Sequence, residues 1–170
     1  MNYEISRILN IDEVPEFDSM FYTSLPFMNN GTYPWPEDAI TDEEKYNLFK
    51  QTCVTTLSQS DSFFFIAKTD GIAIKLDGGT RYAGGYLALF YGIGDRVNGS
   101  LSWIHDIDVT IKQKEFLINN GFRGILLSAM PDQSAEKYIL GGYAKIPGTT
   151  FETLTTPPGI LTRITKIDFN

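Results

Sequence analysis

The stretch 123–143, RGILLSAMPDQSAEKYILGGY, constrains the possible folds more than any other part of the chain. Gly124–Met130 is a continuous apolar run bounded by Gly and Pro, a pattern typical of a strand buried on both faces of a sheet. Asp132 or Ser134 can cap the short helix that we expect over roughly 134–140, and a Gly-Gly pair then ends it. A strand whose helix packs back on it predicts an α/β layer architecture.

Three short motifs predict where helices begin, and one predicts a hairpin. Asn10–Glu13, Thr41–Glu44 and Thr110–Gln113 have the spacing of capping boxes, in which a side chain at each end bonds the free N–H groups of a helix start. Asp70-Gly71 lies between two strand-like runs and favours a tight hairpin turn. The remaining elements follow from the apolar period: strands 3–9, 62–68, 71–76, 82–91, 100–107, 149–154 and 160–169, with helices after residues 10, 41 and 110.

The length of 170 residues predicts one domain, 1–170, of the α/β (α+β) class that the expected elements indicate, and composition excludes several classes of function. A hydrophobic content of 42% supports a packed core, and no apolar run is long enough to span a membrane. The start of the chain lacks signal-peptide features, so we expect a cytoplasmic location or a particle assembled in the cell. The net charge of −7 argues against binding to nucleic acid or to an anionic membrane, and against long-range attraction of an anionic cofactor.

Cysteine and histidine are too scarce for two kinds of site. Cys53 and His105 are each the single residue of their type, which excludes intramolecular disulfides and argues against a structural zinc site. Cys53 falls on the apolar face of the helix after Thr41, so we interpret it as a buried hydrophobe. Asp106 and Asp108 supply too few ligands for a hard cation, and we predict no metal.

Residues 135–143 resemble a pattern of the GCN5-related N-acetyltransferase (GNAT) superfamily. Ala135, Tyr138 and Gly142 match the helix late in that fold, and Tyr143 stands where Phe is usual. The predicted order of strands and helices is also similar over nearly the whole chain. The resemblance implies a mixed, mostly antiparallel central sheet flanked by about four helices, with Tyr138 as the general acid that protonates the thiolate of coenzyme A.

The chain departs from that family where the acetyl-CoA diphosphate would bind. The segment 103–113, WIHDIDVTIKQ, has no glycine to let backbone N–H groups wrap a diphosphate, and it places Asp106 and Asp108 near the expected anion. We therefore expect no cofactor. If acetyl-CoA or another acyl-CoA binds nevertheless, the resemblance implies contacts from Ile107, Val109 and Lys112.

Two further predictions concern His105 and the segment 24–38. His105 is a candidate general base, although a structural histidine on the strand that includes Trp103 is the favoured interpretation. Phe27, Tyr33 and Trp35 give the segment 24–38 an aromatic character. In the GNAT fold this connection lines the acceptor side, so these residues are either an acceptor or partner loop or an aromatic plug on the core.

These observations leave three hypotheses. The first is a non-catalytic GNAT-like domain that acts through protein contacts; its organisation also resembles GNAT-like virion proteins of short-tailed bacteriophages, which would imply virion or tail proteins as partners. The second is an atypical acyl-CoA-dependent N-acyltransferase for an amine, with Tyr138 as acid and His105 or water as base. The third is a module that binds a small ligand or peptide without chemistry.

Overall fold

The computed structural model describes residues 2–90, 92–94, 96–97, 100–101, 107–129, 143, 145–154 and 163–170. Its helices are α1 (Phe17–Phe27), α2 (Asp42–Leu57) and α3 (Ile107–Asn119), and its strands are β1 (Tyr3–Ile8), β2 (Ser62–Thr69), β3 (Ile72–Tyr82), β4 (Tyr86–Leu89), β5 (Ile93–Gly94), β6 (Arg96–Val97), β7 (Ser100–Leu101), β8 (Gly124–Ala129), β9 (Thr149–Leu154) and β10 (Arg163–Phe169). In the described residues no helix is both long and apolar enough to cross a bilayer.

The main sheet consists of two antiparallel blocks joined by one parallel pair of strands. Its order is β1-β2-β3-β4-β8-β10-β9, with β5 paired to β3 beside β4. Among the described strands only β4 and β8 run parallel, over three residue pairs, and the other pairings in this sheet are antiparallel. The prediction of a mixed, mostly antiparallel α/β sheet is therefore confirmed.

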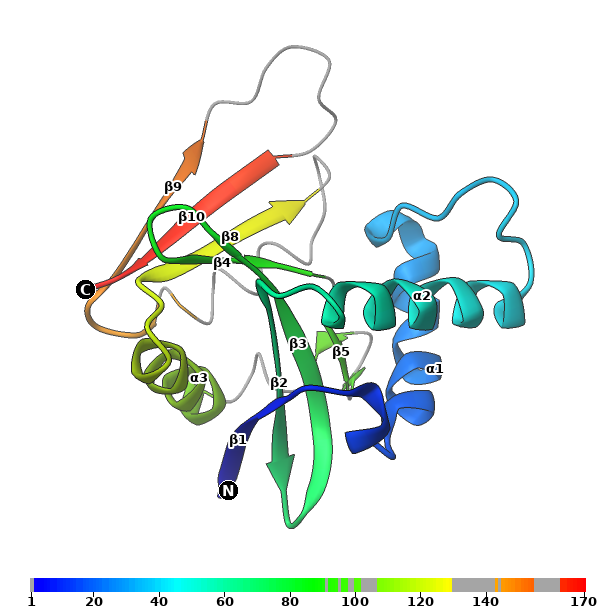
Figure 1. Cartoon of the computed structure of the whole chain (residues 1–170), viewed down its shortest axis with the longest axis horizontal. Helices are drawn as coiled ribbons and strands as arrows, with labels where there is room; N and C mark the ends of the chain where they lie inside the picture. Colours follow the sequence, from blue (N-terminus) through cyan, green and yellow to red (C-terminus); the bar gives the residue numbers. More distant parts are fainter. Residues whose placement is uncertain are drawn as a thin grey trace.

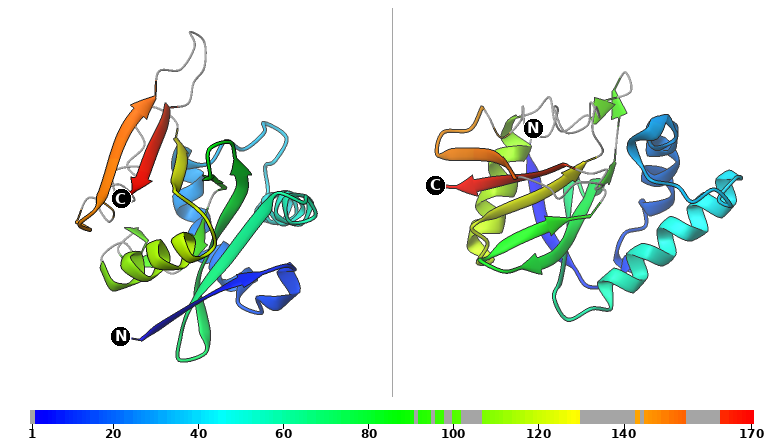
Figure 2. Two further views of the ribbon diagram at one scale, coloured as in Figure 1. Left: turned by 60° about the vertical axis from the view of Figure 1, so that its left-hand side comes forward. Right: turned by 90° about the horizontal axis from the view of Figure 1, so that it is seen from above.

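Helices cover both faces of the sheet. Figures 1 and 2 show α1 and α2 on one side and α3 on the other. The three phenylalanines that open β2 explain this: Phe64 is buried in the cluster formed with α1 and α2, whereas Phe63 and Phe65 are buried in the cluster formed with α3. Because successive side chains of a strand point to opposite faces, a continuous apolar run marks a strand covered on both.

The predicted start of α2 is confirmed in detail. The Glu44 N–H donates to Thr41 Oγ1 over 3.1 Å, and the Thr41 N–H donates to Glu44 Oε2 over 2.9 Å. The backbone N–H groups of Thr41 and Ile40 lower the pKa of the Glu44 carboxyl. Cys53 is buried on the inner face of this helix, as predicted, and burial raises the pKa of its thiol to about 12. Val54, the next residue, is exposed.

The capping box at Asn10–Glu13 also forms, although it opens a single 3-10 turn, Ile11–Glu13, and not the long helix. α1 begins only at Phe17, beyond Pro15. Phe17, Met20 and Phe21 recur at helical spacing along α1, and all three are buried.

In the described part of residues 72–120, the structure differs from the sequence prediction around the β3–β4 hairpin and at the start of α3. β3 continues through Gly78 to Tyr82, and the chain turns at Gly84 and Gly85, whose φ angles are +87° and +86°, so the expected strand 82–91 is a hairpin turn followed by β4. The expected helix start at Thr110 is wrong: α3 begins at Ile107. Asp108 lies in the first turn, where the helix dipole favours it.

The packing around Gly124 generates a stability prediction. A Cβ atom added at Gly124 would lie 2.0 Å from the carbonyl oxygen of Ile167 and 2.9 Å from the ring of Tyr86. Gly124→Ala must therefore push apart the strands on both sides of β8, and we expect it to lower the free energy of unfolding by more than about 3 kcal/mol. Urea denaturation measures this change.

Gly71→Ala is the matched control for that measurement. Gly71 has a φ of +78° and no atom within 4 Å of an added Cβ, so only its backbone conformation opposes the substitution. We expect a loss of about 1 kcal/mol. Equal effects of the two substitutions would show that the β8 contact does not limit stability.

Candidate functional site

The parallel ladder between β4 and β8 ends early, and the two strands then diverge. It comprises Tyr86↔Gly124, Leu87↔Ile125 and Ala88↔Leu126, while β8 continues to Ala129. On the other side of β4, the register with β3 shifts by one residue between Leu89 and Ile93. β5 then pairs only with β3 in the described part of the sheet. The backbone edge of β5 that faces away from β3 is thus left without a strand.

A side chain of α1 occupies this edge. The Gly94 N–H donates to Ser24 Oγ over 3.2 Å, and the Ser24 hydroxyl donates to the Gly94 carbonyl over 3.2 Å. Ser24 is fully buried. One hydroxyl therefore satisfies both backbone groups that a neighbouring strand would otherwise bond.

A buried polar network lies on the opposite face of the sheet, against α3. Lys75 Nζ is 3.6 Å from Asp77 Oδ2 and also donates to Gln113 Oε1, and Gln113 Nε2 donates to the Tyr143 hydroxyl over 2.7 Å. All four side chains are buried. The network connects β3, α3 and the residue at which the GNAT pattern usually has Phe.

Burial is the largest cause of the pKa shifts in this network. Removal from water lowers the pKa of the Lys75 ammonium and raises the pKa of the Asp77 carboxyl, while their mutual attraction opposes both shifts. The Gly78 N–H also stabilises the Asp77 carboxylate, over 2.8 Å. Burial raises the pKa of the Tyr143 hydroxyl, and the charge of Asp77 adds to that increase.

Asp77 also contacts the chain between β4 and β5. A Cβ atom added at Gly92 would lie 3.2 Å from the Asp77 carboxyl carbon and 3.3 Å from its Oδ1. Gly92 therefore lets the backbone approach a buried carboxylate at the point where β4 and β8 separate. No local pattern in the sequence predicts this contact. The one signal in the sequence is that Lys75 and Asp77 place opposite charges two residues apart, on one face of β3.

The residues predicted to contact a cofactor lie on α3. Ile107 is partly exposed, whereas Val109 is fully buried in a cluster with Tyr3. The Lys112 ammonium donates to the Tyr3 carbonyl over 2.9 Å and to Asn2 Oδ1 over 3.2 Å. Lys112, the only basic side chain predicted to contact a diphosphate, is thus hydrogen-bonded to the N-terminal segment of the chain. Tyr138 and His105 lie outside the described residues.

Two of the three aromatic residues of the predicted acceptor loop, Tyr33 and Trp35, pack against the core. Phe27 is the last residue of α1, and the rings of Tyr33 and Trp35 lie 4.4 Å apart. Both are half-buried against the cluster of α1 and α2, where Tyr33 meets Phe49 at 5.7 Å. Their contact with an acceptor or partner stays a prediction.

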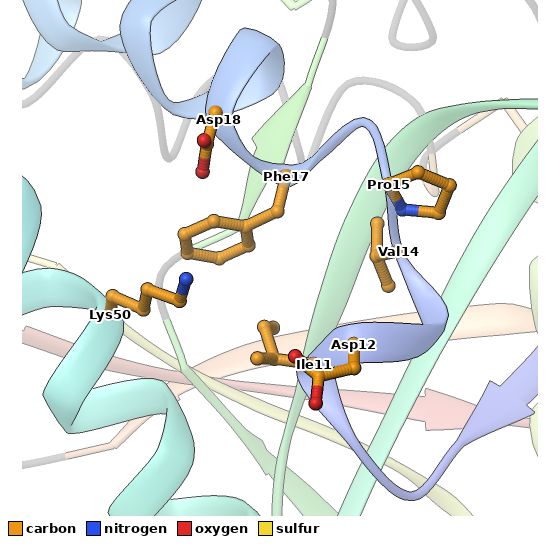
Figure 3. A pocket seen from close by; sticks show the side chains of 7 residues that line it. All are labelled: Ile11, Asp12, Val14, Pro15, Phe17, Asp18 and Lys50. Carbon is orange, nitrogen blue, oxygen red and sulfur yellow. The ribbon is translucent and has the colours of Figure 1, made fainter.

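A shallow pocket lies between α1, α2 and the turn before α1. It has a volume of about 210 Å³, and Figure 3 shows the Lys50 ammonium pointing toward the ring of Phe17, with Asp12 and Asp18 at its rim. Ligand clefts commonly measure about 300–1,000 Å³. This pocket is too small to hold coenzyme A.

No family model and no curated protein matches the chain. Solved structures do match it over nearly its whole length. A PaiA N-acetyltransferase from Thermoplasma acidophilum, in complex with coenzyme A, has a TM-score of 0.67 and 14% identity over 99% of this chain and 100% of its own. A GNAT-family acetyltransferase from Staphylococcus aureus has a TM-score of 0.60 and 15% identity over 99% of this chain and 100% of its own. A probable GNAT-family acetyltransferase from Chromobacterium violaceum has a TM-score of 0.63 and 13% identity over 99% of this chain and 86% of its own. The chain therefore has the GNAT acetyltransferase fold.

The Lys75–Asp77 pair generates a prediction about pH. In Lys75→Met the Asp77 carboxylate loses its countercharge, so we expect a loss of about 3–5 kcal/mol in the free energy of unfolding at pH 7. Because burial raises the pKa of Asp77 above its ordinary 3.8, the folded variant retains a proton that the unfolded chain releases, and its stability falls further as pH rises from that value. Denaturation at pH 5 and pH 8 measures the slope.

Two variants control this experiment. Lys75→Met with Asp77→Asn removes the buried charge, so we expect most of the lost stability to return and the added pH slope to disappear. Lys166→Met removes the surface ion pairs of its ammonium with Glu152 and Asp168, over 3.3 Å and 3.8 Å, and we expect a change below about 1 kcal/mol. A pH slope in Lys75→Met equal to that of the natural sequence would contradict the prediction.

Proposed function

We propose that this chain is an acyl-CoA-dependent N-acyltransferase that acts on an amine. The observation that carries the proposal is the divergence of β4 and β8 within a GNAT fold. The ladder stops after Ala88↔Leu126, and the outer edge of β5 has no neighbouring strand in the described residues. An extended ligand that contains amide groups, as the thioester arm of acyl-CoA does, can bond such an edge as a further strand would.

The chemistry requires one nucleophile, one leaving group and two proton transfers. The neutral nitrogen of the amine attacks the thioester carbonyl, the carbon–sulfur bond breaks, and an amide and a free thiol result. The proton lost by the amine goes to a base, and the leaving thiolate takes a proton from an acid. The sequence resemblance assigns the acid to Tyr138, and His105 is the candidate base.

The distribution of charge favours a cationic acceptor on the side of α1 and α2. Between residues 9 and 61 the chain has ten acidic and two basic residues, whereas the rest of the chain has eleven acidic and twelve basic residues. The acidic ones are Asp12, Glu13, Glu16, Asp18, Glu37, Asp38, Asp42, Glu43, Glu44 and Asp61. A polyamine or a lysine-rich peptide is attracted to such a surface.

The second candidate is a non-catalytic domain that contacts other proteins, including virion or tail components. The bonding of Lys112 favours it, because that ammonium donates to the Tyr3 carbonyl and to Asn2. An acidic residue, Asp108, also lies in the first turn of α3, where an anionic cofactor would approach the helix. Both features oppose a diphosphate near this end of α3.

Titration with acetyl-CoA by calorimetry separates the two candidates. We expect binding in the micromolar range and release of free thiol when a polyamine is added. Tyr138→Phe is expected to lower kcat by about 10²–10⁴-fold while KM for acetyl-CoA changes little, because only the acid is removed. Tyr82→Phe, at an exposed tyrosine at the end of β3, is the matched control and should keep full activity.

A thiol reagent can follow this reaction directly. Cys53 is the only cysteine and is buried, so the folded protein contributes little background signal. The absence of acetyl-CoA binding at millimolar concentration would refute the enzyme and leave the non-catalytic candidate.

A further inference from the structure

We propose that Ser24 determines the affinity of the β5 edge for its ligand, because its hydroxyl occupies the two backbone groups that an incoming amide must bond. This inference rests on the proposed function. Ser24 Oγ bonds both the N–H and the C=O of Gly94, each over 3.2 Å. An extended amide that adds to this edge has the same donor and acceptor pattern, so it competes with Ser24 for Gly94.

The hydrogen bonds between Ser24 and Gly94 are long enough for an incoming amide to replace them. A distance of 3.2 Å is long for a hydroxyl donor, whose bonds to oxygen usually measure about 2.5–3.0 Å. The buried backbone groups of Gly94 still require a partner when no ligand is present, because leaving them unpaired is costly. Ser24 supplies that partner, and displacement of its hydroxyl is a cost that binding must overcome.

The hydrogen bonding of α1 is weakened close to Ser24. Pro26, two residues later, lacks the N–H that would bond the carbonyl four residues before it, so the helix is weakened at this point. α1 ends at Phe27 and continues directly into a π-helical turn, Met28–Thr32. π-helical turns are rare and often mark functional sites. The end of α1 is therefore the part of this helix least able to resist a shift away from β5.

The experiment compares the affinity for acetyl-CoA of the natural sequence and of Ser24→Ala by calorimetry. Because Ser24→Ala leaves Gly94 without a partner until ligand binds, we expect its Kd to fall by about 5–30-fold. Ser24→Thr keeps the hydroxyl and should retain the natural Kd. Ser62→Ala is the matched control: Ser62 is also buried and donates to the Leu57 carbonyl over 3.1 Å, at the start of β2, and its removal should leave Kd unchanged.

The outcomes are distinct. An unchanged or raised Kd in Ser24→Ala, with normal binding by the natural sequence, overturns the role of Ser24 and leaves the proposed function standing. No binding by any variant at millimolar acetyl-CoA overturns both. If Ser24→Ala fails to fold, the Gly94 amide resonance of the natural protein gives the answer: it must shift when acetyl-CoA is added, and an unchanged resonance in a protein that binds refutes the proposal.

Discussion

The three-pair parallel ladder between β4 and β8 is the interaction on which the rest of the structure depends. It joins the block β1-β2-β3-β4 to the block β8-β10-β9, and neither block pairs with the other elsewhere in the described sheet. Neighbouring contacts reinforce it: the Arg123 N–H donates to the Gly85 carbonyl over 2.7 Å, and the Tyr86 hydroxyl donates to Asp168. A short, reinforced junction holds the blocks together at one end and lets their strands separate at the other.

The buried network of Lys75, Asp77, Gln113 and Tyr143 lies next to this separation. Transfer of two charges from water into the protein interior costs several kcal/mol each, and apolar side chains of similar volume usually give equal or greater stability. The network is thus a poor source of stability. It does fix relative positions, since each hydrogen bond has one partner and one direction, and it ties β3 to α3 and to Tyr143. The Asp77 carboxylate also lies close to the backbone at Gly92 and limits the position of the chain there.

Local chemistry made much of the fold predictable. The capping box of α2, the turn at Asp70-Gly71 and the apolar run of β8 each depend on residues within a few positions of one another. The start of α3 was predicted wrongly because Thr110 and Gln113 have capping-box spacing, yet both are buried within the helix. Tertiary burial outweighed the local signal there. The pairing of Ser24 with Gly94 joins residues 70 positions apart and leaves no local pattern.

The uneven charge changes how the net value of −7 bears on function. Averaged over the surface, that charge opposes an anionic cofactor. Residues 9–61, which form α1, α2 and their connections, hold an excess of eight acidic residues, while the rest of the chain is close to neutral. Since the Debye length is about 10 Å at 0.1 M salt, exposed acids on α1 and α2 are largely screened from the α3 side of the sheet. An acidic side formed by α1 and α2 and a nearly neutral opposite side suit the proposed reaction, in which a cationic amine and an anionic thioester would approach the diverging strands from different directions.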